Sequence, residues 1–134
     1  MHTFEDLIIV NNTMIQQKIY FNSRDRLIRI DAEKIVYFEG EGNYTYMVNA
    51  SKHKVCLTLN LANTEKALAA QLGEEAKQFM RIGKRFIVYM NYIYQVNVLT
   101  QTLMLSDSEH FMFQMPVSKE ALKVVKDLVI KTKI

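Results

Sequence analysis

The stretch Asn43-Tyr44-Thr45-Tyr46-Met47-Val48-Asn49, followed after four residues by Lys54-Val55-Cys56-Leu57-Thr58-Leu59, decides the fold class of this chain. Apolar side chains stand at every second position of both segments, namely Tyr44, Tyr46, Val48, Val55, Leu57 and Leu59. Such alternation is typical of half-buried strands. Residues 50–53, three of which are polar, predict a turn, so the two segments are expected to pair as an antiparallel hairpin.

Similar short segments recur along the chain, with polar turns between them. Further candidate strands span residues 18–23, 26–30, 35–39, 79–82, 92–98, 102–106 and 110–114. Two stretches show helical spacing instead. One covers residues 61–72, with Asn60 or Asn63 available as N-cap and Gly73 as a stop, and the other follows Pro116, with Ser118 placed to cap it. We therefore expect a mainly β fold of antiparallel hairpins with one short internal helix and a C-terminal helix.

A chain of 134 residues has room for one domain. We interpret residues 1–17 as an N-terminal arm or extra strand and residues 18–134 as the domain. The longest apolar runs, such as 7–10 and 86–90, are far shorter than the roughly 20 residues that cross a bilayer. Glu5 and Asp6 do not fit a secretory signal, and the lone Cys56 cannot form an intrachain disulfide. These features favour a cytoplasmic protein that does not enter a membrane.

Catalytic and metal-binding motifs are not recognisable in the sequence. His2, His53 and His110 lie far apart, with no cysteine or carboxylate at the usual metal-ligand spacings, so we expect no metal and no cofactor. Gly40-Glu41-Gly42 precedes a strand-like segment rather than a helix, which favours a tight turn or bulge over a phosphate-binding loop. We expect neither an enzyme nor a small-molecule substrate.

Positive charge is concentrated in the body of the chain. The first 17 residues carry two acids and no Lys or Arg, so the rest carries +5 against +3 for the whole chain. Residues 77–85 hold four basic residues and no acid, and the last 17 residues hold five lysines against two acids. Such runs are ordinary solvated surfaces in most proteins. However, Gly83-Lys84-Arg85 lies between two apolar, strand-like segments, and a basic loop of this kind can reach into a groove of DNA.

The order of several motifs resembles the LytTR family, the DNA-binding domains of bacterial transcription regulators, over about residues 18–128. The motifs are Ile35-Val36-Tyr37-Phe38-Glu39, Gly42-Asn43-Tyr44-Thr45, the helix opening at 61–68, Phe79-Met80-Arg81-Ile82, Phe86-Ile87-Val88, Tyr92-Ile93 and Met115-Pro116-Val117-Ser118-Lys119. Each motif is degenerate alone, whereas the order and spacing together are fairly specific.

The resemblance implies an elongated stack of antiparallel sheets, with loops from one side entering successive major grooves of duplex DNA. Carried over by motif, the expected DNA contacts are Asn43, Thr45, Lys84, Arg85 and Lys119, with Arg81 adding a phosphate contact. This chain departs from the family at the second loop, where His-Arg-Ser is usual and Gly83-Lys84-Arg85 stands here, and at Tyr89, where Asn is usual. Because Gly83 has no side chain and Lys84 is a flexible point charge, we expect phosphate affinity more than base readout from this loop.

Two hypotheses of function follow. The first is a DNA-binding transcriptional regulator that inserts basic loops into major grooves. Family members commonly carry a receiver domain in front, for which 17 residues are too few, so we expect control by the amount of the protein, by a partner on the arm around residues 7–10, or by homodimerisation on repeated half-sites. The second is a protein-interaction or dimerisation module that keeps the scaffold without sequence-specific readout, because a fold does not fix a function.

Overall fold

The computed structural model describes residues 14–133, in which ten strands form three antiparallel sheets alongside two α-helices. The strands are β1 (Lys18–Asn22), β2 (Leu27–Asp31), β3 (Ile35–Glu41), β4 (Tyr44–Asn49), β5 (Lys54–Leu57), β6 (Phe79–Ile82), β7 (Phe86–Tyr89), β8 (Ile93–Asn97), β9 (Thr102–Ser106) and β10 (Met112–Pro116). The α-helices are α2 (Leu61–Leu72) and α3 (Lys119–Thr132), and short 3-10 helices cover Ala32–Lys34, Gly73–Gln78 and Met90–Tyr92. The predicted mainly β fold is confirmed.

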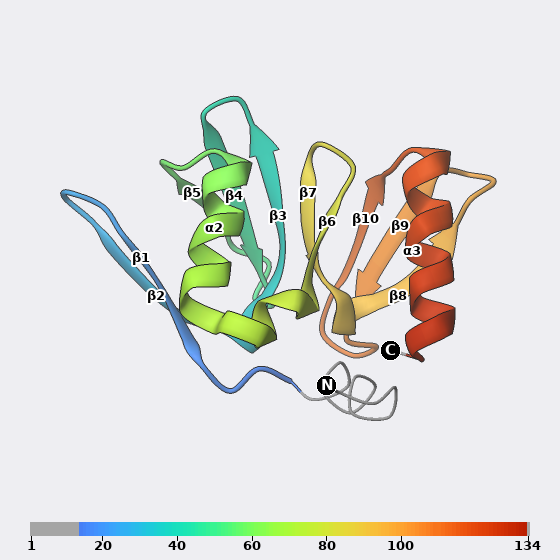
Figure 1. Cartoon of the computed structure of the whole chain (residues 1–134), viewed down its shortest axis with the longest axis horizontal. Coiled ribbons are helices and arrows are strands. Elements are labelled where there is room, and N and C mark those ends of the chain that lie inside the picture. The colour runs from blue at the N-terminus through green and yellow to red at the C-terminus, as the bar shows by residue number, and fades with distance from the viewer. Residues whose placement is uncertain (1–13, 134) are drawn as a thin grey trace.

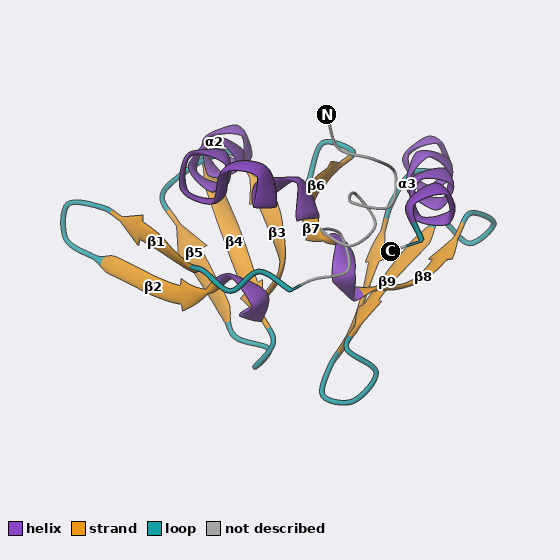
Figure 2. Cartoon of the chain, turned by 60° about the horizontal axis from the view of Figure 1, so that its bottom comes forward, coloured by secondary structure: helices purple, strands orange, loops and turns teal. Residues whose placement is uncertain are grey.

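The sheets follow one another along the long axis of the molecule (Figure 1). The β1–β2 hairpin lies at one end, a five-stranded sheet of order β5-β4-β3-β7-β6 in the middle, and a three-stranded sheet of order β10-β9-β8 at the other end. Figure 2 shows α2 over the five-stranded sheet and α3 over the three-stranded one. The predicted stack of antiparallel sheets is therefore also confirmed.

Two hydrophobic cores lie on opposite faces of the five-stranded sheet. The first core is shared with α2 and the β1–β2 hairpin and includes Phe38 and Leu68. The second core is shared with the three-stranded sheet and α3 and includes Val88, Leu105 and Leu122. The central strands are consequently covered on both sides.

Strand β7 illustrates the effect of this double cover on the sequence. All four of its residues are buried, with Phe86 and Val88 in the second core and Ile87 and Tyr89 in the first. A strand buried on both faces is a continuous apolar run rather than an alternating one. This explains why the segment looks strand-like in the sequence without showing the period of two.

Helix α2 has the predicted boundaries, and α3 begins directly after Ser118, as predicted. Asn60, rather than Asn63, caps α2, because its side-chain oxygen accepts the Asn63 amide at 2.8 Å. Gly73, with φ of 58°, ends α2 in a conformation that favours glycine. The Ser118 hydroxyl accepts the amide of Ala121 at 3.3 Å and begins α3.

The strand predicted at 110–114 is displaced to Met112–Pro116. The cause is the β9–β10 loop, where one carboxylate oxygen of Asp107 accepts the amides of Glu109 and His110 at 2.9 and 2.7 Å. An aspartate that bonds its own following backbone in this way stabilises a turn, so pairing with β9 starts later.

The N-terminal arm predicted at residues 1–17 lies, for residues 1–13, outside the described residues. Of the remainder, Ile15 is fully buried, and its amide donates to the Tyr89 hydroxyl at 2.9 Å. This segment therefore packs onto the first core. Within residues 14–133, none of the helices has the length and apolar character needed to span a membrane.

Candidate nucleic-acid interface

Three connections lie along one edge of the molecule, at the top of Figure 1. They are the β3–β4 turn at Gly42-Asn43, the β6–β7 loop at residues 83–85, and the β10–α3 junction at residues 117–119, which includes the first residue of α3, and we call them together the loop edge. The amide of Gly40 donates to the carbonyl of Arg85 at 2.7 Å, which ties the second loop to β3. A groove of about 440 Å³ between residues 82–86 and 116–118 joins the second loop to the third.

Two tight turns depend on glycine. Gly42 and Gly83 each have φ of 62°, a left-handed value that other residues adopt only at a cost. Each glycine is the first residue of its turn, and the flanking pairs Glu41–Tyr44 and Ile82–Phe86 close the two hairpins. The sequence prediction of a tight turn at Gly42 is confirmed.

The first turn exposes different side chains from those expected. Asn43 is exposed, but Thr45 is 0% exposed, paired with Gly40 and Leu57 in the sheet, and its hydroxyl has no partner among the described residues. Tyr44 is instead 51% exposed beside Asn43. The face of β4 that carries Thr45 is therefore buried, and the face that carries Tyr44 is the more exposed one, opposite to the assignment expected from polarity alone. In this conformation Thr45 cannot touch DNA.

The second loop presents two cations in different states. Lys84 is exposed, and its ammonium has no partner among the described residues. Arg85 is 60% exposed, its guanidinium donates to the Glu39 carboxylate, and it lies 5.5 Å from the centre of the Phe86 ring. Lys84 is therefore free to bind an anion, whereas Arg85 must first leave Glu39.

The two remaining predicted contacts, Arg81 and Lys119, differ in their exposure to solvent. Arg81 is only partly exposed: its guanidinium donates to the Lys84 carbonyl at 3.2 Å and lies 3.5 Å from a carboxylate oxygen of Glu65. Its Nε is buried without a partner among the described residues. Arg81 therefore holds the backbone of the second loop through the Lys84 carbonyl rather than projecting from the loop edge. Lys119 is exposed in the first turn of α3, directly after the third connection.

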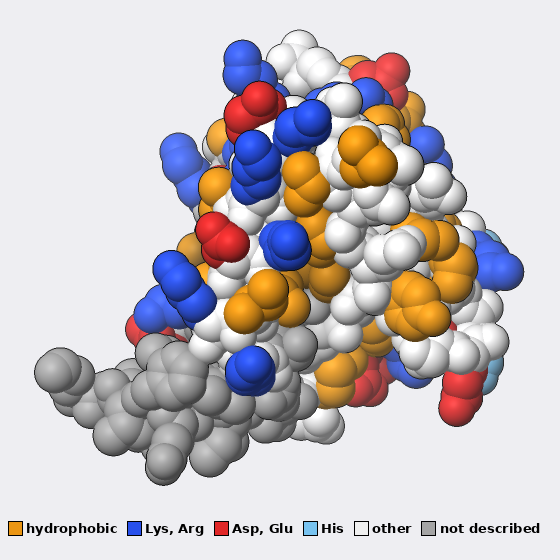
Figure 3. Space-filling view, turned by 90° about the vertical axis from the view of Figure 1, so that its right-hand side faces the viewer, with side chains coloured by type: hydrophobic (Ala, Val, Ile, Leu, Met, Phe, Trp, Pro, Cys, Tyr) orange, Lys and Arg blue, Asp and Glu red, His pale blue; other side chains and the backbone are white. Residues whose placement is uncertain are grey.

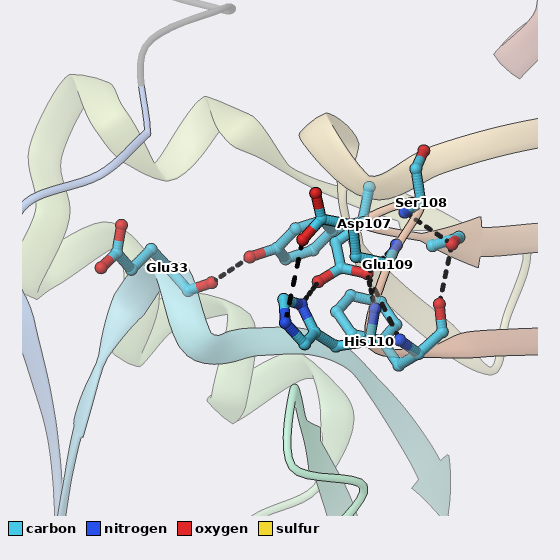
Figure 4. Close-up of polar contacts among 8 residues, drawn as sticks. Glu33, Asp107, Ser108, Glu109 and His110 are labelled. Carbon is cyan, nitrogen blue, oxygen red and sulfur yellow. Dashed lines mark hydrogen bonds and ion pairs between the residues drawn. The ribbon is translucent and has the colours of Figure 1, made fainter.

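A second group of polar side chains lies at the opposite end of the strands, in the β9–β10 loop (Figure 4). The ring of His110 lies 2.7 Å from the Asp107 carboxylate and 3.8 Å from that of Glu109. Burial raises the pKa of Tyr92 to about 12, so its hydroxyl stays protonated and donates to the Glu33 carbonyl. The His110 contacts stay within the loop, and the Tyr92 bond joins the 3-10 helix Met90–Tyr92 to the 3-10 helix before β3, so both have a structural role.

Residues 25–130 of this chain match the LytTr DNA-binding domain family. The chain belongs to that family. The LytTR match covers the second core, most of the first core, all three connections of the loop edge and most of α3. It also agrees with the motif order in the sequence, and the family is one of DNA-binding domains rather than of enzymes.

Known proteins resemble this LytTR domain in sequence and in fold. The heme-containing CO-sensing transcriptional regulators RcoM 2 and RcoM 1 of Paraburkholderia xenovorans are 28% and 27% identical to it over 111 residues. That alignment covers 83% of this chain and 39% of each regulator, so the chain spans about two fifths of the length of these relatives. A LytTr DNA-binding domain from Bacillus cereus, of a protein described as a methyl-accepting/DNA response regulator, shares the fold with a TM-score of 0.56 at 20% identity. It aligns with 84% of this chain and 95% of that one.

The structure of this LytTR domain brings together four of the six side chains predicted from the sequence. Asn43, Lys84, Arg85 and Lys119 are exposed on the loop edge, whereas Arg81 lies behind it and Thr45 below it. Tyr44 was missed, because an aromatic residue in an alternating strand was interpreted as part of the buried face. The sequence signal for an exposed Tyr44 is its position directly after the predicted turn at Gly42.

Proposed function

We propose that this LytTR domain binds duplex DNA with its loop edge and acts as a transcription regulator in the bacterial cytoplasm. The observation that carries the proposal is the convergence of three connections, two from the five-stranded sheet and one from the three-stranded sheet, on one edge that exposes Lys84 and Lys119 without ion-pair partners among the described residues. Unpaired cations on projecting loops neutralise phosphates and displace counterions from DNA.

The proposal divides affinity and sequence preference between different loops. Lys84 and Lys119 supply phosphate contacts, which position the domain but carry no sequence information. Asn43 lies at a hairpin tip, and its amide can donate to and accept from adenine in the major groove. Tyr44 adds an aromatic surface that contacts the thymine methyl group or the sugar. Base preference therefore depends on the first turn more than on the second loop.

The test is binding of the purified protein to a pool of random duplexes at 50 and 200 mM salt, followed by sequencing of the retained fragments. Over this interval each phosphate contact accounts for roughly a 3.5-fold loss of affinity, from a slope of about −0.9 per contact. In Lys84→Ala and in Lys119→Ala, the loss of affinity between 50 and 200 mM salt should be about 3.5-fold smaller than in the wild type. Lys34→Ala, an exposed lysine far from the loop edge, is the control and should change nothing.

The retained sequences decide the finer points. An enriched motif repeated at a spacing of about 10 base pairs would support two copies of the domain on repeated half-sites. Asn43→Ala should then flatten the preference at one or two positions while leaving overall affinity similar. Absence of binding at both salt concentrations would refute the proposal and favour a protein-interaction module on the same scaffold.

A further inference from the structure

Helix α3 carries a row of lysines that begins at the loop edge. With 3.6 residues per turn, Lys119, Lys123 and Lys126 fall within an arc of about 60° on one flank of the helix, and Lys133 follows the last turn as the C-cap residue, in a left-handed conformation. The two acids of the helix, Glu120 and Asp127, lie beyond one edge of this arc, about 40–60° around the helix from Lys123. Figure 3 shows the basic side chains spread along the whole length of α3. We call these four lysines the α3 row.

The α3 row is not neutralised within the domain. All four side chains are exposed, and none of them forms an ion pair with another described residue. In contrast, Lys18 lies 2.5 Å from the Asp31 carboxylate, and Lys77 lies 2.8 Å from that of Glu74.

The spacing within the α3 row also works against the helix. Lys119 and Lys123 are separated by four positions, and Lys123 and Lys126 by three, which are the spacings at which like charges on a helix repel each other. Glu120 and Asp127 lie three positions before and four positions after Lys123, so their attraction offsets part of this repulsion and the remainder stays uncompensated. An external anion with several charges in a line relieves the repulsion.

The geometry points to a continuous polyanion. From Lys119 to Lys133 the helix rises about 21 Å, at 1.5 Å per residue. Duplex DNA presents one phosphate charge per about 1.7 Å of its axis, so a segment of roughly six base pairs offers charges along the whole row. Lys119 belongs to both the loop edge and the α3 row, so one duplex can pass from the first surface to the second.

We propose that the α3 row is a second phosphate-binding surface, which takes the duplex that flanks the segment held by the loop edge. The inference rests on the proposed function, since a duplex must be at the loop edge for its flank to meet α3. Because α3 runs away from that edge, the flanking duplex reaches the far lysines by curving toward the helix, a deformation that proteins commonly impose on DNA.

A membrane fits the same helix less well. An amphipathic helix that binds a bilayer inserts its apolar face among the lipids. The apolar face of α3, including Leu122 and Val125, is already buried in the second core. Only Val124 and Ile130 remain exposed as large apolar side chains of α3, and they lie about 120° apart around the helix axis, so they do not form one apolar face.

The experiment compares two charge-matched triple variants on two duplexes. The row variant is Lys123→Gln, Lys126→Gln and Lys133→Gln, which leaves Lys119 in place. The control variant is Lys34→Gln, Lys52→Gln and Lys66→Gln, three exposed lysines on other elements. The short duplex is the shortest fragment that the wild-type protein retains on trimming, and the long duplex extends it by about 10 base pairs on each side. Affinities are measured by fluorescence anisotropy at 50 and 200 mM salt.

The row variant should match the wild type on the short duplex, which also shows that it is folded. On the long duplex, the loss of affinity between 50 and 200 mM salt should be about 40-fold smaller for the row variant than for the wild type. The reason is that three phosphate contacts, each worth roughly 3.5-fold over this interval, are missing. The control variant should behave as the wild type on both duplexes.

Equal salt dependence of the row variant and the wild type on the long duplex, with the short duplex still bound, would overturn this inference and leave the proposed function standing. Binding of phosphatidylserine vesicles that is lost in the row variant, without any difference on DNA, would overturn it in favour of a membrane surface. Failure of the wild type to bind the short duplex would refute the proposed function itself.

Discussion

Replacing Glu39 by Gln should strengthen DNA binding. In the structure the Glu39 carboxylate accepts from the Arg85 guanidinium, and the Glu39 side chain is 21% exposed while that of Arg85 is 60% exposed. Because the Arg85 side of the pair is open to solvent, we take the strength of the pair as that of a surface ion pair, about 0.2–1 kcal/mol. A DNA phosphate must compete with that attraction for Arg85. Glu39→Gln keeps the size of the side chain and its acceptor oxygen but removes the charge, so affinity should rise about 1.4-fold to 5-fold.

The assay is a titration of a labelled duplex followed by fluorescence anisotropy, repeated between 50 and 200 mM salt. The released Arg85 should add one phosphate contact, which steepens the slope of log affinity against log salt by about 0.9. Glu41→Gln is the matched control: it removes an equal charge from the same edge, where Glu41 is exposed and has no ion-pair partner among the described residues. The reasoning is refuted if the two variants gain equally, or if the gain of Glu39→Gln persists in an Arg85→Gln background.

Three further predictions concern stability and are measured by urea denaturation. Desolvation raises the pKa of Asp107, but hydrogen bonds from the loop amides and from His110 lower the pKa by more than desolvation raises it. The folded pKa therefore lies well below the unfolded value of about 3.9. The resulting stabilisation is present above about pH 4 and is lost as pH falls, and Asp107→Asn should flatten this acid-side decline; an unchanged profile would contradict it. Gly40→Ala should destabilise the domain by about 1–3 kcal/mol, because the new Cβ would lie 3.0 Å from the Cβ of Leu61, and a neutral result would show that α2 shifts freely. Tyr89→Phe leaves the buried amide of Ile15 without its acceptor and should cost about 1–3 kcal/mol, with a smaller loss indicating that water replaces the hydroxyl.

Local signals in the sequence were sufficient for most of the elements. The caps at Asn60 and Ser118, the stop at Gly73 and the turn at Gly42 each act within a few residues, so their effect can be inferred without knowing the rest of the fold. The same holds for the strand at Phe79–Ile82, whose predicted bounds agree with β6.

The orientation of β4 could not be obtained in the same way. Tyrosine is apolar in its ring and polar at its tip, so Tyr44 and Tyr46 suit either face of a sheet. The choice depends on α2, which packs closely over Gly40 and places Leu61 and Thr45 on the covered side of the sheet. That contact joins segments about 20 residues apart and leaves no periodic signal.

The ion pairs of Arg81 and Arg85 could not be predicted from the sequence either. The acid that holds Arg85 is Glu39, 46 residues away, and the one that approaches Arg81 is Glu65, 16 residues away on α2. A basic run in a sequence shows where cations are concentrated, but not which of them are already paired. In this chain the difference separates Lys84, which is free, from Arg85, which is not.

The backbone of the second loop is held in place, although the loop consists of a glycine and two basic residues with long, flexible side chains. The Arg85 carbonyl accepts the Gly40 amide from β3, and the Lys84 carbonyl accepts from the Arg81 guanidinium, so the loop backbone is fixed at two successive residues. A fixed backbone lowers the entropy lost on binding, and Lys84 needs only to direct its ammonium to a phosphate. Affinity and sequence preference can then vary independently, because Lys84 lies on the β6–β7 loop and Asn43 on the β3–β4 turn of one rigid sheet. Substituting Lys84 should weaken binding to all sequences alike, whereas substituting Asn43 should alter only which sequences are preferred.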